Sequence, residues 1–74
     1  MITLNQINKA ITKVHPGVEL VRGEGYFYII GTTDEMSDKI NMLYNTSINI
    51  HHLNQQPSIE TWVNDVTRLL KQGL

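Results

Sequence analysis

The residues of this chain that could do chemistry are few, and their spacing assembles neither a catalytic nor a metal site. His51 and His52 are adjacent. Neighbouring residues of a strand point to opposite faces, so we expect His51 to face solvent and His52 to lie at a strand end, without a shared metal ion. The acidic residues of segment 34–38 lack the spacing of a calcium loop, and the sequence contains no phosphate-binding loop or nucleophile elbow. We therefore expect no cofactor, no metal and no enzymatic activity.

The clearest pattern is the run Val18–Gly31, in which three consecutive aromatic residues follow a turn punctuated by glycines. The strand-like segments Val18–Arg22 and Tyr26–Ile30 flank this turn. Exposed tyrosines on such a hairpin could bind a protein surface, where tyrosine is enriched, or stack on nucleic-acid bases. Tyrosine and phenylalanine are also ordinary strand residues. The pattern therefore indicates a hairpin more firmly than it indicates a ligand.

Two registers of this hairpin are open. In the first, Gly23 and Glu24 form a type II′ turn, and one face of the hairpin is wholly apolar. Its cross-strand pairs are Leu20–Phe27, Val18–Ile29, Val21–Tyr26 and Glu19–Tyr28. In the second, a three-residue turn with a left-handed Gly25 brings Leu20 and Tyr28 onto one face. We favour the first register because it gives the cleaner half-buried sheet.

Two helices with apolar stripes frame the rest of the chain. The N-terminal helix is predicted to begin at Thr3, with a capping box. The last helix has Ser58 as its N-cap, or Pro57 as its first helical residue, and Gly73 as its C-cap. Trp62 lies on its apolar stripe and is expected to anchor the core.

The pattern between the hairpin and the last helix predicts a short helix or loop, followed by one further strand. Residues 33–44 read either as about two helical turns or as a loop with a helical fragment. Ser47–Leu53 reads as a third strand, with Ile48 and Ile50 facing the core. The order α-β-β-(short α or loop)-β-α predicts a two-layer α+β fold. In it, helices cover one face of a three-stranded antiparallel sheet, and residues 1–74 form a single small domain.

Bulk composition narrows the classes of function. The chain has 74 residues, no cysteine and a formal net charge of −1, so thiolate zinc sites are excluded and a large phosphate-binding footprint is disfavoured. No apolar run approaches the roughly 20 residues that span a membrane, and no secretory signal pattern is present. We therefore expect a cytoplasmic protein that does not bind membranes.

Three family resemblances accompany these patterns. The octamer Arg22–Ile29 partly resembles that of RNA-recognition motifs, which implies base stacking on the tyrosines, although Glu24 and Ile29 replace stacking aromatics. The order of elements is similar to that of double-stranded RNA-binding domains. In place of their lysine cluster, however, residues 57–61 carry one acid and no base. Residues 18–66 also resemble small uncharacterised proteins of phages and mobile elements, which implies an accessory role in binding a macromolecule.

A mixed polar and aromatic face of the sheet is our candidate binding site. With helices on one side, the first register leaves the other side open, with Glu19 at its edge. The expected face consists of Val21, Tyr26, Tyr28, Asn49 and His51. We expect a non-enzymatic interaction module that binds a protein partner or forms a homodimer, alternatively a nucleic-acid-binding module that uses the same tyrosines. An open strand edge could also pair with a second copy.

Overall fold

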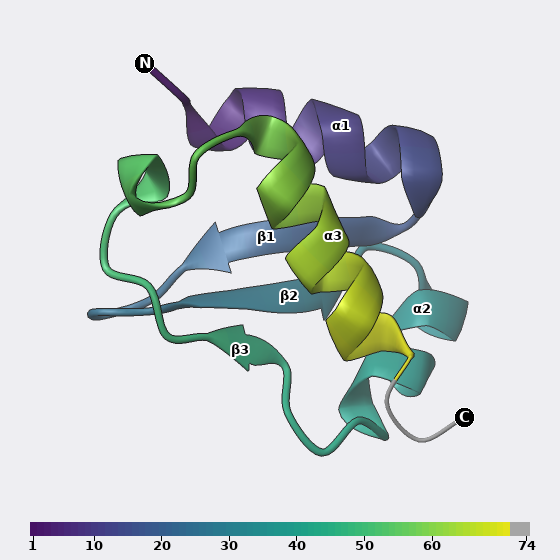
Figure 1. The fold of residues 1–74 in the computed structure, drawn as a ribbon. Helices are drawn as coiled ribbons and strands as arrows, with labels where there is room; N and C mark the ends of the chain where they lie inside the picture. Colours follow the sequence, from purple (N-terminus) through teal and green to yellow (C-terminus); the bar gives the residue numbers. More distant parts are fainter. Residues whose placement is uncertain (72–74) are drawn as a thin grey trace.

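The computed structural model describes residues 1–71, and Gly73, the predicted C-cap of the last helix, lies outside them. The elements, in chain order, are α1 (Leu4–Val14), β1 (Val18–Arg22), β2 (Phe27–Gly31), α2 (Asp34–Asn41), β3 (Ser47–Ile48), the 3₁₀ helix η1 (Leu53–Gln55) and α3 (Ile59–Leu70) (Figure 1). This order confirms the small α+β domain and shows that residues 34–41 of the segment 33–44 form a helix of about two turns. Within the described residues, no helix is long and apolar enough to cross a membrane.

Each α-helix has a residue with a hydroxyl side chain as its N-cap. Such a hydroxyl oxygen accepts a hydrogen bond from a backbone N–H of the first helical turn. Thr3 caps α1 in the predicted capping box, Thr33 caps α2 by accepting from the Met36 N–H at 3.2 Å, and Ser58 caps α3. Pro57 therefore lies outside α3.

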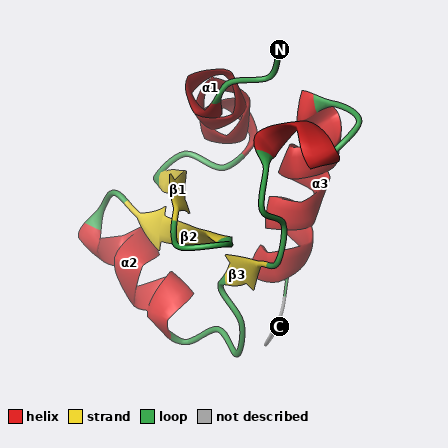
Figure 2. Ribbon diagram, turned by 90° about the vertical axis from the view of Figure 1, so that its left-hand side faces the viewer, coloured by secondary structure: helices red, strands yellow, loops and turns green. Residues whose placement is uncertain are grey.

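The three strands form an antiparallel sheet in the order β1-β2-β3. The two long helices, α1 and α3, lie against one face of this sheet, as predicted (Figure 2). The short helix α2 packs against β2 at the end where that strand stops. Its backbone approaches so closely that a Cβ atom on Gly31 would lie 2.2 Å from the Ser37 nitrogen.

The core lies between the sheet and the two long helices. Its centre is Trp62, whose indole N–H donates to the Leu53 carbonyl oxygen at 3.0 Å and whose ring meets Phe27 edge-on, at 5.1 Å between centroids. Trp62 and Phe27 are fully buried. The buried set consists of Ile7, Ile11, Val18, Leu20, Phe27, Ile29, Ile40, Leu53, Trp62, Val66 and Leu69.

The hairpin turn differs from both predicted registers. The Gly23 N–H donates to the Tyr26 carbonyl at 2.8 Å, so Glu24 and Gly25 are the central residues of the turn. Gly25 has φ +77°, and no described residue other than glycine has a positive φ, so Glu24 is not in the conformation of a type II′ turn. The left-handed glycine is the one that the second register required.

The strand register is shifted by two residues from the favoured one. Leu20 lies opposite Ile29, and Val21 lies opposite Tyr28. The pairings predicted for the first register are therefore wrong. Because side chains alternate with a period of two, however, an even shift leaves the residues of β1 and β2 on their predicted faces.

The third strand is much shorter than predicted. It ends at Ile48, where the Ile50 N–H donates back to the Ile48 carbonyl at 2.9 Å and bends the chain at Asn49. Asn49 and His51 therefore lie beyond the sheet rather than on its face. Likewise, the second strand begins at Phe27, so Tyr26 belongs to the turn.

Candidate interaction surface at the hairpin

The outward face of the hairpin, opposite α1 and α3, is built by the alternation of β1 and β2. Val21 and Tyr28 form a direct cross-strand pair on this face, and both are half-buried. Ile30 follows on the same face and is 37% exposed. Apart from the exposed Glu19, which lies opposite Ile30, this face presents apolar and aromatic side chains where a solvated sheet would present polar ones.

Tyr26 extends this face from the turn. Its ring centroid lies 5.9 Å from that of Tyr28, with the ring planes tilted by 40°. The Tyr26 ring covers Gly23, where a Cβ atom would lie 2.7 Å from its Cζ atom. Within residues 1–71, neither tyrosine hydroxyl has a hydrogen-bond partner. The two rings thus form one unit with two unpaired hydroxyl groups.

His51 reaches the same turn from a distant part of the chain. Its ring atoms Cε1 and Nδ1 would lie 3.4 Å from a Cβ atom on Gly25, so the imidazole lies beside the turn. The backbone N–H groups of His51 and His52 both donate to the Gln55 Oε1 atom at 2.7 Å. Gln55 therefore positions this loop, and its place three residues after His52, as in a capping box, was a signal that sequence reasoning missed.

The structure brings together four of the five residues of the predicted face. We name this set the hairpin surface; its members are Val21, Tyr26, Tyr28 and His51. Asn49 is exposed, but no side-chain hydrogen bond within the described part of the chain joins it to the tyrosines. The hairpin surface contains no lysine or arginine, and the Arg22 guanidinium lies over the Phe27 ring, 5.4 Å from its centroid.

A hollow of about 370 Å³ adjoins the hairpin surface where α2 meets β2. Tyr28 and Ile30 line it from the strand, and Ser37 and Asn41 line it from α2. Sequence reasoning missed this hollow because it depends on where α2 packs. The segment that follows α2 also carries exposed large side chains of its own, Met42 at 84% and Tyr44 at 95%.

No known protein family, curated protein sequence or solved structure matches this chain. The function proposed below therefore rests on the residues and their geometry.

Metal-binding groups do not gather anywhere in residues 1–71: no three histidine or acidic side chains there are placed to hold an ion. The one histidine with a shifted pKa, His15, joins α1 to α3. Its Nε2 atom lies 2.7 Å from the Thr67 hydroxyl oxygen, which itself donates to the Val63 carbonyl. The hydroxyl therefore accepts from His15. Burial, and secondarily the charge of Lys71, lower the pKa of His15.

Proposed function

We propose that this protein is a small non-enzymatic interaction module that binds a protein partner through the hairpin surface. The observation that carries the proposal is the Tyr26–Tyr28 ring pair, 5.9 Å between centroids, on a face that the long helices leave uncovered. Tyrosine combines a large apolar ring with a polar tip and is enriched where proteins meet. Two unpaired hydroxyl groups at the same place add donors that a partner can satisfy.

The test replaces both tyrosines with serine and compares captured partners. Proteins retained by the immobilised wild-type chain from its native cells should be lost from the Tyr26→Ser/Tyr28→Ser variant. Tyr44→Ser is a matched control, because Tyr44 is equally aromatic, 95% exposed and not part of the hairpin surface. Retention of the same partners by a folded double variant would refute the proposal.

A nucleic-acid-binding function is the second candidate, because the same two rings could stack on bases. It requires phosphate contacts, whose affinity falls steeply with salt, whereas an apolar and aromatic protein interface depends little on salt. The net charge of −1 weighs against it. Binding of single-stranded RNA at low salt, lost at higher salt and in the double variant, would favour this candidate over protein binding.

The cellular setting belongs to the same proposal. The resemblance of residues 18–66 to small proteins of phages and mobile elements supports an accessory protein of that origin, acting in the cytoplasm. Identification of the partners captured above would test this setting directly.

A further inference from the structure

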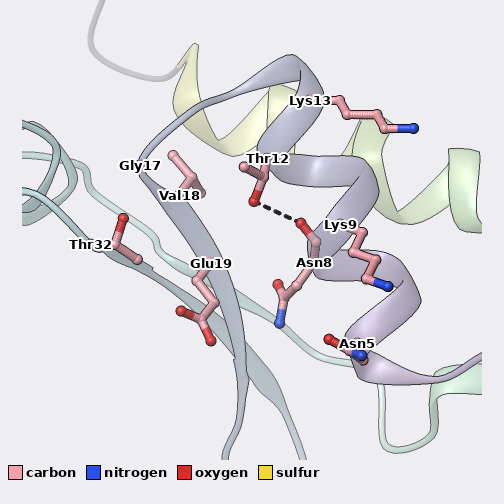
Figure 3. Close-up of a pocket in the computed structure, with 9 residues that line it drawn as sticks. All are labelled: Asn5, Asn8, Lys9, Thr12, Lys13, Gly17, Val18, Glu19 and Thr32. Carbon is pink, nitrogen blue, oxygen red and sulfur yellow. Dashed lines mark hydrogen bonds between the residues drawn. The ribbon is translucent and has the colours of Figure 1, made fainter.

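The outer edge of β1 is bridged by a single side chain of α1. The Asn8 carboxamide accepts from the Leu20 N–H through Oδ1 at 2.7 Å and donates through Nδ2 to the Leu20 carbonyl at 3.1 Å. Figure 3 shows the Asn8 side chain pointing from α1 toward β1. A carboxamide carries the same donor and acceptor as a peptide group, so Asn8 takes the place of a neighbouring strand at Leu20.

The rest of this edge carries further backbone groups that point outward. In an antiparallel ladder, alternate residues face the partner strand, so the backbone groups of Val18 and Arg22 point the same way as those of Leu20. The Val18 N–H is bonded to the His15 carbonyl at 3.2 Å. The Val18 carbonyl and both Arg22 groups therefore remain directed at the edge, where a strand could pair.

The helix leaves open space beside the start of β1, at Val18 and Glu19. A groove of about 460 Å³ lies between α1 and β1, and Asn8 is among the residues that line it. Asn5 lies on the same wall of the groove, and its side chain has no hydrogen-bond partner within the described residues. Thus Asn8 alone joins α1 to the middle of the β1 edge by hydrogen bonds.

The opposite edge of the sheet is closed in a similar way. The Ser47 N–H donates to the Asn45 Oδ1 atom at 3.0 Å. Because the Ile29 N–H bonds to Thr46, the alternation directs the Ser47 backbone groups away from β2. Hence an asparagine side chain bonds to the backbone at each edge of this small sheet. Natural proteins protect exposed strand edges against pairing by various devices, and these contacts act in the same way.

We propose that Asn8 is an edge lock that prevents β1 from pairing with β1 of a second copy of this chain. Without the lock, two antiparallel β1 strands can pair about a two-fold axis near Leu20, since the same edge serves both copies. The two tyrosines on which the proposed function rests are not in β1 and take no part in this contact, so the proposal stands apart from the proposed function.

The test measures the oligomeric state of Asn8→Ala by sedimentation across a wide range of concentration. We expect wild type and the matched control Asn5→Ala to remain monomeric, and Asn8→Ala to double in mass as its concentration rises. Adding Arg22→Pro, which removes an outward N–H that β2 does not use, should restore the monomer. A folded Asn8→Ala variant that stays monomeric, or a wild type that already pairs through β1, would overturn the proposal.

Hydrogen exchange of the wild type gives a readout that needs no folded variant. With Asn8 bound to it, the Leu20 N–H should exchange roughly tenfold more slowly than the Arg22 N–H on the same edge. Equal exchange rates would overturn the lock. If Asn8→Ala does not fold, Asn8→Ser, whose hydroxyl is too short to reach Leu20, takes its place in the sedimentation comparison.

Discussion

Gly31, the last residue of β2, is the position at which a single added carbon should disturb the fold most clearly. A Cβ atom there would lie 2.2 Å from the Ser37 nitrogen and 2.5 Å from the Met36 carbonyl carbon. Ordinary Cβ contacts begin near 3.4 Å, so α2 must retreat by about 1.2 Å, the difference between 3.4 and 2.2 Å, to accommodate alanine. The φ angle of Gly31 is not in the left-handed region, so the whole penalty is steric.

The loss of stability expected for Gly31→Ala depends on the core packing that α2 provides. Ile40, on this helix, is 4% exposed and belongs to the core, so a displaced α2 also loses packing there. Overpacking costs about 1–3 kcal/mol in general. We expect the upper end, about 3 kcal/mol, because the obstacle is helix backbone rather than a movable side chain. A domain of this length has a total stability of roughly 4–11 kcal/mol, so the loss is large.

Urea unfolding measures this loss as a shift of the midpoint at constant slope. The matched control is Thr32→Ala, because Thr32 is exposed and its hydrogen bond to Gly17 uses only backbone atoms. We expect the control to lie within about 0.5 kcal/mol of wild type, as surface changes usually do. A Gly31→Ala variant as stable as that control would refute the close packing of α2 on β2.

Substitutions at three further positions should change stability or local contacts in a defined direction. Gly23→Ala should displace the Tyr26 ring and remove its nuclear Overhauser contacts to the other hairpin tyrosine. Its unfolding free energy should change by less than about 1 kcal/mol, because the obstacle can move and alanine restricts the unfolded chain; persistent contacts would contradict this.

For His15, the folded-state pKa is below the unfolded value, so the unfolded chain binds the proton more readily. The unfolding free energy should therefore fall as pH drops through 6.5 toward the folded-state pKa, and His15→Asn should flatten this dependence. Unfolding curves at several pH values would contradict this if the two proteins lost equal stability. Trp62→Phe removes the donor to the Leu53 carbonyl and leaves a cavity, which together should cost about 2–4 kcal/mol in urea unfolding; a loss under about 1 kcal/mol would contradict this.

The elements and their buried faces could be predicted because they depend on local periodicity and capping. Thr3 and Ser58 sit before apolar stripes, and the alternation of Leu20 and Phe27 assigns the core face in any register of even shift. Tertiary contacts decided the rest. The third strand stops at Ile48 because the chain turns back on itself there, and no composition rule marks that point.

The tyrosines of the candidate site could be predicted from the sequence, but the close contact of one ring with a glycine could not. Gly23 and Gly25 were both interpreted as turn residues, but Gly23 also leaves room for the Tyr26 ring. Since Gly23 lacks a side chain, the Tyr26 ring can lie across the strand end and still reach Tyr28. A Cβ atom on Gly25 would lie at an ordinary contact distance of 3.4 Å from the His51 ring, so Gly25 serves the turn through its φ of +77°. Gly23 thus allows the ring of Tyr26, a turn residue, to lie against the ring of Tyr28 on β2. For this reason Gly23→Ala tests the hairpin surface by displacing one ring without removing any of its side chains.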